Sequence, residues 1–541
     1  MADPDADEFD VVVVGFGAAG ACAAIEAARA GARVLICDRF QGGGASALSG
    51  GVVYAGGGTG PQRSAGVTDT EDAMFAYLRE EVGDAVSPAL LRRFCDESTG
   101  MIDWLADLGV PFEGSLCPYK TSYPSNRHYL YYSGSEASGG FRDTAPPAPR
   151  GHRVHGRGSS GKVLFHHLAD AVAKAGVLVR TQTAVTDLVT DDTGRVTGVV
   201  TKTLAPGWAR TRHRLLSRYV AKPGLYVPAI RKLLHRRAER LERRHARTTR
   251  IEARHGVILA AGGFVANRAM LREHAPNHRS GLPLGTPGDD GSGIRLGVTA
   301  GGATRLLDRV SAWRFISPPS AMLGAILVDA QGKRLIDESR YGAAIGDALI
   351  GRRGWLLVDN ALRTDVRAQL RTQTVWFQRW QTRYLLGRAA VHGPTVADVA
   401  AKAGIDPVGL AATLAAHNDA AAVGAPDPIG KPAEFVRSLV NAPYSLLDIS
   451  IRPSIAYPCP MLTLGGLVVH EDTGQVRRPD GSTVDGLYAA GRTAVGVCSN
   501  SYVSGLSLAD CVFSGRRAGR HAGTAVAITA LDQEGGSRAE H

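Results

Sequence analysis

Residues 9–38 read FDVVVVGFGAAGACAAIEAARAGARVLICD, and they contain the strongest structural signal in the chain. A β-branched apolar run opens the segment, as expected of a strand that is buried on both faces. A GxGxxG motif follows, then an alanine-rich stretch of helical length, and then a second apolar run that ends at Asp38. The glycines of the motif are Gly15, Gly17 and Gly20. This order of elements predicts a βαβ unit.

Such a unit binds a dinucleotide. Its first glycine permits a tight turn, its second lets the backbone approach a pyrophosphate, and its third lets the helix pack closely on the strand. The N–H groups at the helix N-terminus can bind the phosphates, and Asp38 can accept hydrogen bonds from ribose hydroxyls. A purely structural glycine turn is the alternative, but a strand, a helix and an acid in one register favour dinucleotide binding.

A second GxGxxG match, GRGSSGKV at 156–163, has a different interpretation. The proline-rich stretch before it is unsuited to a central strand. Val163 also offers no hydroxyl for Mg²⁺ where a phosphate-binding P-loop has Ser or Thr. We therefore expect a loop that caps a helix over 162–175, and no second nucleotide-binding fold for NAD(P)H.

The composition is that of a globular protein. Hydrophobic residues make up 44% and charged residues 21% of the 541 residues, and glycine is unusually common at 66, which indicates many tight turns and close backbone approaches. Seven scattered cysteines without a CxxC pair argue against a disulfide framework and a metal site. No apolar run reaches the roughly 18 residues of a membrane helix, and no secretory signal opens the chain. We expect a cytoplasmic protein.

One segment carries the excess of positive charge. Residues 202–254 contain 16 Lys and Arg and 3 Asp and Glu, a local charge of +13, whereas the whole chain carries +11. The remainder is nearly neutral, which argues against a nucleic-acid partner. Apolar residues at helical spacing lie between the arginines, so residues 203–254 form either a solvated charged face or an element on anionic lipid. In the second case the protein contacts the inner membrane peripherally.

Two later segments, GVILAAGGF at 256–264 and GLYAAGR at 486–492, complete a recognisable order. With the N-terminal βαβ unit they resemble the flavoproteins of the fumarate reductase and 3-ketosteroid dehydrogenase superfamily, over nearly the whole chain. The resemblance implies an α/β fold, in which a discontinuous Rossmann-like FAD-binding domain carries an inserted α+β capping domain for the substrate. The implied parts are a first FAD-binding part over 1–295 with the basic insertion 203–254, a substrate domain over 296–454, a second FAD-binding part over 455–530 and a polar tail over 531–541.

The resemblance makes FAD the cofactor, and the absence of His and Cys between Asp38 and Tyr54 indicates that FAD is not covalently attached. The residues implied to hold the ADP half are Gly15, Gly17, Gly20 and Asp38, with Ala184 at the adenine and Ala261 and Gly262 on the ribose side. Those implied along the ribityl chain and the flavin are Ala45, Ser46, Ser49, Gly50, Gly51, Gly491 and Arg492. The other residues implied to bind FAD are Ala18, Ala19, Arg39, Asn267, Ser507 and Leu508.

The substrate side differs from that of the dicarboxylate enzymes. Fumarate and succinate enzymes clamp two carboxylates with Arg and His. Here the stretch 498–508, CSNSYVSGLSL, lacks the arginine, and 463–466, TLGG, lacks the histidine. Without a bidentate clamp a dianion is poorly recognised. The tyrosines that remain suit a flat, neutral, apolar ligand with a carbonyl.

These tyrosines resemble those of 3-ketosteroid dehydrogenases. Tyr502-Val503-Ser504 is similar to the Δ4-(5α) enzymes, whereas the Δ1 enzymes usually have Tyr-Pro-Gly at this place. The implied reaction is dehydrogenation of ring A of a steroid at the 4,5 bond, with loss of a proton beside the ketone and of a hydride to the flavin. The implied catalytic residues are Tyr341, Tyr502 and Ser504, and the implied substrate contacts are Tyr119, Tyr123 and Gly505.

Which tyrosine acts as base stays open, and so does the physiological electron acceptor. Ser504 is a candidate to relay the proton, and the N–H group near Gly505 with one tyrosine hydroxyl can hold the carbonyl oxygen. The alternatives are a Δ1-dehydrogenase, an ene reductase related to fumarate reductase that acts on another apolar enone, and a non-enzymatic adaptor that carries lipid.

Overall fold

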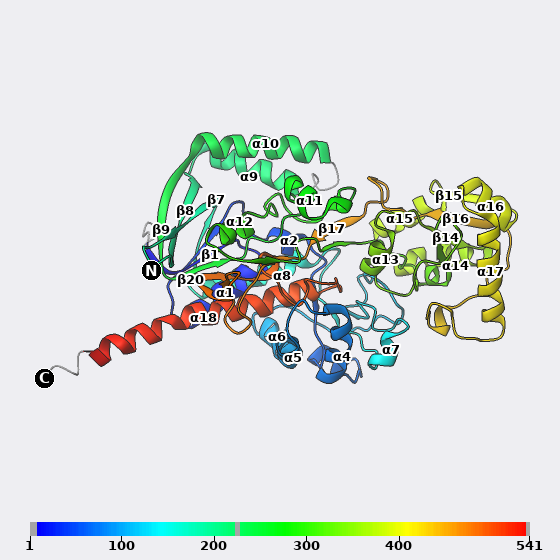
Figure 1. The fold of residues 1–541 in the computed structure, drawn as a ribbon, viewed down its shortest axis with the longest axis horizontal. Coiled ribbons are helices and arrows are strands. Elements are labelled where there is room, and N and C mark those ends of the chain that lie inside the picture. Colours follow the sequence, from blue (N-terminus) through cyan, green and yellow to red (C-terminus); the bar gives the residue numbers. More distant parts are fainter. Residues whose placement is uncertain (1–7, 222–227, 537–541) are drawn as a thin grey trace.

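The computed structural model describes residues 8–221 and 228–536. Residues 222–227 of the basic segment and 537–541 of the expected tail lie outside the described residues. A large part built on a parallel sheet lies beside a smaller part with an antiparallel sheet and its own helices (Figure 1). The predicted α/β fold class is confirmed.

The predicted βαβ unit forms the centre of the large sheet. Strand β1 (Glu8–Val14) pairs in parallel with β2 (Val34–Asp38) on one side and with β9 (Ala246–Leu259) on the other, and α1 (Ala18–Arg29) connects β1 to β2. The valines of β1 are almost completely buried, and each contributes roughly 1.5–3 kcal/mol relative to an exposed side chain. The sheet order is β19-β20-β9-β1-β2-β6, and β8 and β7 continue from β9.

The alanine-rich helix α1 packs on the long C-terminal helix α18 (Leu506–Gly536). Gly515, Gly519 and Gly523 recur every four residues on α18, and a Cβ at Gly519 would lie 2.1 Å from the carbonyl oxygen of Ala23 on α1. Four-residue spacing places these glycines on one face of the helix. The two helices therefore approach backbone to backbone, which explains why both sequences are so rich in small residues.

The basic segment forms a helical hairpin between two strands of the large sheet. Helices α9 (Trp208–Ala221) and α10 (Pro228–His245) lie side by side over one edge of that sheet (Figure 1). The strands before and after them pair antiparallel, with Leu204 of β8 (Val196–Leu204) opposite Ala246 of β9. We call α9 and α10 the basic hairpin.

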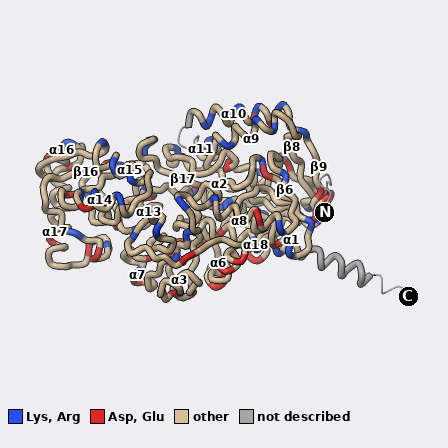
Figure 2. The backbone as a smooth tube through the Cα atoms, turned by 180° about the vertical axis from the view of Figure 1, so that it is seen from behind, with Lys and Arg blue, Asp and Glu red and all other residues tan. Residues whose placement is uncertain are grey.

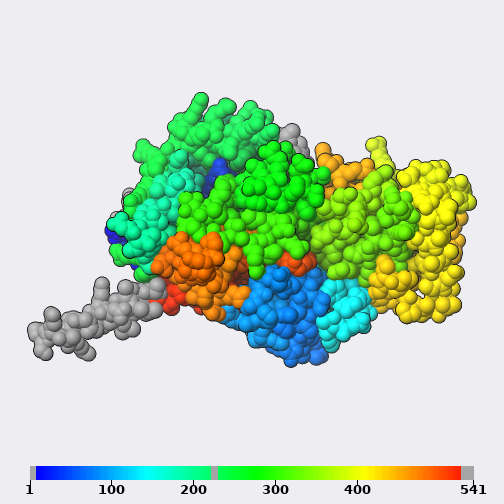
Figure 3. Space-filling view, viewed as in Figure 1, coloured from blue at the N-terminus to red at the C-terminus, as the bar shows by residue number. Residues whose placement is uncertain are grey.

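The smaller part is built on a four-stranded antiparallel sheet in the order β13-β14-β16-β15. A separate hydrophobic core around Trp355 and Leu356 lies between this sheet and its helices. Figure 3 shows the two parts in contact along one broad boundary. The elements are β13 (Ile326–Val328), α13 (Gly342–Leu349), β14 (Trp355–Val358), α14 (Asn360–Gln373), α15 (Trp376–Leu386), β15 (Ala390–Gly393), α16 (Val396–Ala403), α17 (Pro407–Ala422) and β16 (Tyr444–Asp448).

The remaining elements surround the large sheet or join the two parts. The predicted helix over 162–175 is found as α8. The N-terminal half contains α2 (Gly44–Leu48), β3 (Val52–Tyr54), α3 (Gly60–Ser64), α4 (Glu71–Val82), α5 (Pro88–Asp96), α6 (Ser98–Asp107), β4 (Leu130–Tyr131), α7 (Phe141–Thr144), β5 (Gly151–Arg153), α8 (Gly161–Lys174), β6 (Leu178–Thr181) and β7 (Thr183–Thr190). The later segments contain α11 (Arg268–His274), β10 (Leu282–Pro283), α12 (Ser292–Thr299), β11 (Thr304–Arg305), β12 (Val310–Ala312), β17 (Pro460–Thr463), β18 (Gly466–Leu467), β19 (Gln475–Arg477) and β20 (Thr483–Ala489).

Within residues 8–221 and 228–536, no helix is long and apolar enough to cross a membrane.

Candidate active site

One large cavity runs from the turn between β1 and α1 to the boundary between the two parts. Its volume is about 1820 Å³, whereas a typical small-molecule site has roughly 300–1,000 Å³. The space therefore suits two ligands placed end to end. The predicted residues in its wall are Gly15, Gly17, Ala18, Ala19, Asp38, Arg39, Ala45, Ser46, Ser49, Gly50, Gly51, Tyr123, Ala184, Ala261, Gly262, Tyr341, Arg492, Tyr502, Ser504, Gly505, Ser507 and Leu508.

Four predicted site residues are not in this wall. Gly20 and Gly491 instead permit close packing around α1. Asn267 caps the N-terminus of α11 through its side-chain oxygen. Tyr119 is partly buried and packs against a small hydrophobic cluster of Val52, Cys117 and Tyr131.

The glycine motif shapes the cavity where α1 begins. Gly15 has φ +104°, and a Cβ there would lie 2.5 Å from the carbonyl oxygen of Ala260, so only glycine fits. A Cβ at Gly17 would meet only the Ser46 hydroxyl at 3.5 Å, which leaves this backbone open to the cavity. The Ser46 Oγ accepts a hydrogen bond from the Ala18 N–H at 3.1 Å. An open helix N-terminus beside accessible backbone is the arrangement that binds a pyrophosphate.

At the end of the cavity where α1 begins, Asp38 connects the turn between β1 and α1 to the segment that follows β2. Its Oδ2 accepts a hydrogen bond from the Phe16 N–H at 3.0 Å, and its Oδ1 accepts from the N–H groups of Phe40 and Gly42. A carboxylate oxygen can accept two hydrogen bonds, so Oδ2 retains one acceptor position for a ribose hydroxyl. Arg39 behaves differently, because its guanidinium binds Glu242 of α10 and Asp290.

The glycine-rich segment after β2 is supported from behind by Tyr123. The Tyr123 hydroxyl lies 2.9 Å from the carbonyl oxygen of Gly50 and 2.8 Å from that of Gly158. A Cβ at Gly50 would lie 2.7 Å from the Tyr123 ring. Ser160 donates a further hydrogen bond to the Gly50 carbonyl. Tyr123 therefore holds the segment in place as well as lining the cavity.

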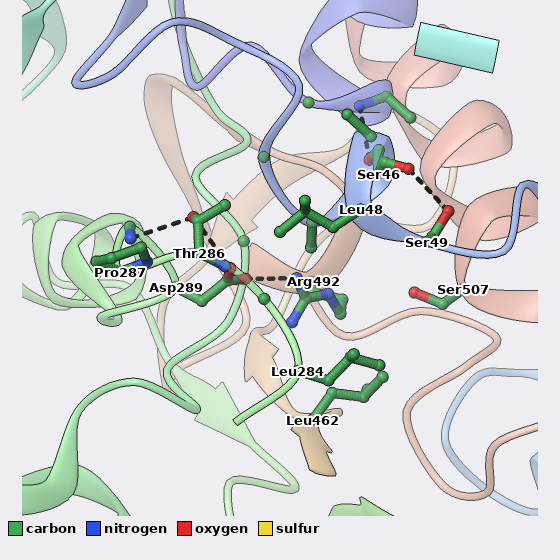
Figure 4. A pocket seen from close by; sticks show the side chains of 18 of the residues that line it. Ser46, Leu48, Ser49, Leu284, Thr286, Pro287, Asp289, Leu462, Arg492 and Ser507 are labelled. Carbon is green, nitrogen blue, oxygen red and sulfur yellow. Dashed lines mark hydrogen bonds and ion pairs between the residues drawn. The ribbon is translucent and has the colours of Figure 1, made fainter. Parts of the chain in front are cut away.

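Arg492 and Asp289 form an ion pair in the middle of the wall (Figure 4). Thr286 donates its backbone N–H to the same Asp289 at 2.8 Å, so the loop before α12 is attached to Arg492. The Nη1 of Arg492 is buried and has no hydrogen-bond partner in the described residues. A buried donor of this kind requires an acceptor, and an oxygen of the cofactor would supply one. The residues present thus fit FAD both at the end of the cavity where α1 begins and in its middle.

Aromatic side chains from both parts meet at the other end of the cavity. Tyr341 immediately precedes α13 of the smaller part, and Tyr502 precedes α18 of the larger part. The centroids of the Tyr341 and Tyr502 rings are 6.3 Å apart. The Trp313 ring packs against Tyr502 with centroids 4.7 Å apart, and the Phe315 ring packs against Tyr341 with centroids 5.6 Å apart. The fold thus brings together two tyrosines that are 161 positions apart in the sequence.

Ser504 lies among the hydroxyl groups of this aromatic end. Its Oγ is 3.2 Å from the hydroxyl oxygen of Tyr131. Burial and the neighbouring Tyr502 raise the pKa of Tyr341 well above its usual value, and the Ser504 hydroxyl offsets this in part. Burial also raises the pKa of Tyr502 above its usual value, and the nearby Gly505 N–H offsets part of this rise. Both phenols are therefore protonated at neutral pH.

Sequence reasoning missed several parts of the wall. The first is the segment 313–318, WRFISP, whose clustered aromatic residues were its only signal. The second is the loop at 157–159, which was interpreted only as a helix cap. Further parts are residues 376–378 of α15, the loop at 284–290 and residues of α9 and α10. Tyr131 also lies at this end, and nothing in the sequence indicates its contact with Ser504.

The described residues contain no group of His, Cys, Asp and Glu arranged to hold a metal ion. All seven cysteines are buried and unpaired.

Comparisons with known proteins agree with this geometry. The model of the FAD binding domain family matches residues 10–508. The chain is 40% identical over 500 residues to the 3-oxo-5-alpha-steroid 4-dehydrogenase of Comamonas testosteroni, covering 90% of this chain and 92% of the relative. It is 24% identical over 538 residues to a fumarate reductase (cytochrome) of Shewanella frigidimarina, covering 96% of this chain and 78% of the relative.

A solved structure is similar over nearly its full length. It is 3-ketosteroid-delta4-(5alpha)-dehydrogenase from Rhodococcus jostii RHA1 in complex with 4-androstene-3,17-dione. The TM-score is 0.78 at 31% sequence identity, covering 95% of this chain and 97% of that chain.

Proposed function

The chain belongs to the FAD binding domain family, and from this premise we propose that it is a flavin-dependent dehydrogenase that oxidises the 4,5 bond of a 5α-3-ketosteroid. The FAD cofactor predicted from the sequence is confirmed by this membership. The aromatic end of the cavity, where Tyr341 and Tyr502 face each other beside Ser504, is the observation that supports the substrate class. The similarity to two Δ4-(5α) enzymes supports the position of the new double bond.

The cavity can separate the two ligands. Gly15, Gly17 and Asp38 would hold the ADP half of FAD, and Arg492 would bind an oxygen atom near its centre. The aromatic end would then hold ring A of the steroid, with its 3-keto oxygen toward Tyr502 and the Gly505 N–H. FAD, when bound, supplies the acceptor for the hydride that leaves C5.

The chain's own residues handle the proton that leaves C4. Two donors on the 3-keto oxygen, the Tyr502 hydroxyl and the Gly505 N–H, would acidify this proton by stabilising the developing enolate. A buried phenol is a weak base on its own. Ser504, in contact with Tyr131 and beside Tyr341, would relay this proton to Tyr341, which takes it as a phenolate and ends as the neutral phenol. The C4–H bond breaks to leave its electron pair in the new C4–C5 double bond, and the C5 hydrogen leaves with its own pair as hydride.

A dicarboxylate substrate has less support. The wall at the aromatic end contains Trp313, Phe315, Ile316 and Met322, which give no binding energy to a carboxylate. Arg314 is nearby, but its side chain donates to the backbone carbonyls of Ser450 and Tyr457.

An anaerobic titration tests the proposal. The purified holoenzyme should lose its flavin absorbance when a saturated 5α-3-ketosteroid is added, and the product should contain a double bond at C4. The corresponding 5β-steroid is the matched control and should react far more slowly. A double bond at C1 would instead identify a Δ1-dehydrogenase. A flavin that fumarate reoxidises but no steroid reduces would favour an ene reductase.

The outer face of the basic hairpin supports peripheral contact with anionic lipid. Leu215 and Tyr219 of α9 are 55% and 51% exposed, and Ile230 and Leu233 of α10 are similarly exposed. Lysines and arginines recur along both helices (Figure 2). Apolar side chains with cations around them are the pattern of interfacial helices. The predicted apolar residues Leu225, Tyr226 and Val227 lie outside the described residues.

A further inference from the structure

The inner face of the basic hairpin covers one end of the cavity. Residues Ser217 and Arg218 of α9 and Glu239, Glu242 and Arg243 of α10 are part of the cavity wall. They lie with Asp38 and Ala184 at the end away from Tyr341 and Tyr502, which the glycine motif identifies as the nucleotide end. The hairpin is an insertion between β8 and β9, so neither strand requires it for its pairing.

Glu242 is the main anchor of this inner face. It accepts a hydrogen bond from Arg39 Nη2 at 2.8 Å and lies 2.9 Å from His213 Nε2 of α9. Burial alone would raise the pKa of Glu242, but the hydrogen bonds from His213 and Arg39 lower it to about 2. The carboxylate is therefore ionised at neutral pH. It connects α9 and α10 to the residue that directly follows Asp38.

Two further contacts hold the hairpin against the cavity wall. Arg231, near the start of α10, donates to the backbone carbonyls of Pro283 at 3.2 Å and Gly285 at 3.0 Å. The His213 ring stacks on Phe40, with centroids 5.9 Å apart and planes 4° from parallel. Phe40 itself lines the cavity. Anchors at both ends of α10 and on α9 hold the hairpin as a cover rather than as a free surface element.

We propose that the basic hairpin is a clasp over the adenosine end of the cofactor site, and that it gives the protein its preference for FAD over FMN. FMN contains the flavin and ribityl phosphate but lacks the adenosine half. A wall that touches only the adenosine end therefore adds binding energy for FAD alone. Glu242 and Arg231 act as positioning residues in this arrangement, because they hold the clasp against Arg39 and the loop before α12.

Binding of the two flavins to the apoprotein separates this role from general structural support. Flavin fluorescence quenching should give the Kd for FAD and for FMN. In Glu242→Gln and in Arg231→Met, we expect the Kd for FAD to rise about tenfold, the effect of losing one charge-assisted hydrogen bond, while the Kd for FMN stays within about twofold. Arg236→Met, on an exposed position of α10 without an ion pair to a described residue, is the matched control and should leave both values unchanged.

A larger change tests the whole clasp. Because Leu204 lies opposite Ala246, residues 205–245 can be replaced by Asn-Gly, which forms a two-residue turn between antiparallel strands. The ratio of the two Kd values should then approach one. An unchanged ratio, or a parallel weakening of both flavins, would overturn the proposal. If the shortened chain fails to fold by circular dichroism, the point variants decide the question. Since turnover is not measured, the result is independent of the steroid assignment.

Discussion

At the scale of single residues, Ser504 contacts other segments of the chain at the aromatic end of the cavity. Its Oγ is 3.2 Å from the Tyr131 hydroxyl, and its carbonyl oxygen accepts a hydrogen bond from Ser133 at 3.0 Å. Gly505 follows with φ +92°, where a Cβ would lie 2.8 Å from the Tyr54 nitrogen. This backbone conformation needs glycine. One short loop before α18 thus places the hydroxyl groups of Tyr502 and Ser504.

Removing the two phenol oxygens tests this arrangement. Tyr502→Phe and Tyr341→Phe should each lower kcat by about 10²–10⁴-fold, the usual effect of losing an acid–base group, and both variants should keep FAD. Ser504→Ala should lose less activity, because water can replace part of a relay. Steady-state rates with a 5α-3-ketosteroid and the flavin absorbance of each purified variant provide the measurement.

Tyr129→Phe serves as the control for these variants. Tyr129 lies in the same stretch of tyrosines, but its hydroxyl donates toward the carbonyls of Asn126 and Gly156, outside the cavity wall. It should retain near-normal turnover. Full activity in both Tyr341→Phe and Tyr502→Phe would remove the basis for the proposed proton chemistry.

At the scale of elements, the glycine-rich stretch from β2 to β3 forms the floor of the cavity. It contains α2 and the residues up to Gly51, where a Cβ would lie 2.5 Å from the Ser160 carbonyl carbon. Small residues here leave room for an extended ligand against the backbone. The described cavity wall contains no histidine, and its cysteines are Cys37 and Cys511. Burial raises the pKa of each thiol to about 12, so both stay protonated and poorly nucleophilic.

FAD should therefore be bound without a covalent link. Precipitation of the holoenzyme with acid should release all of the flavin into the supernatant, where its absorbance can be compared with that of the protein before treatment. Yellow colour on the washed precipitate would contradict this expectation.

At the scale of the whole molecule, the site exists only where two parts of the chain meet. The glycine motif and Ser504 belong to the larger part. Tyr341 and the hydrophobic core on which α13 packs belong to the smaller part. The hairpin adds a second function to one side of this assembly. Its inner face lies against the cavity wall, while Leu215, Tyr219, Ile230 and Leu233 are exposed on helices that carry many lysines and arginines (Figure 2). An enzyme bound to lipid through that face could collect a sterol directly from it.

Vesicle co-sedimentation examines the outer face. The holoenzyme should bind vesicles that contain anionic lipid and should dissociate from them at high salt. It should not bind neutral vesicles, because each basic residue near an anionic surface contributes about 1 kcal/mol to the binding free energy. The double variant Leu215→Ser, Tyr219→Ser should bind more weakly, whereas Arg231→Met, which changes the inner face, should bind nearly as well as the unaltered protein. Binding to anionic vesicles that is unchanged when residues 205–245 are replaced would refute the idea.

The sequence by itself determined the local and repetitive features of this protein. The βαβ unit, its glycine turn and the helix over 162–175 follow from short-range patterns, because φ above zero, close approach and apolar periodicity are properties of neighbouring residues. The family and the FAD cofactor followed from the order of such motifs along the chain, and the steroid-type substrate followed from the resemblance of the tyrosine-containing segments. Each of these inferences required no knowledge of long-range contacts.

Only the tertiary structure decided which distant residues share the cavity. Tyr123 supports Gly50 and Tyr131 contacts Ser504 because segments far apart in sequence become neighbours, whereas Tyr119, in the same stretch, is not part of the wall. The sequence showed the basic segment as one charged surface, and the fold divides it into an inner and an outer face. Arg39 likewise binds Glu242, 203 positions away. Such pairings depend on how helices and strands pack, and local periodicity contains no record of them.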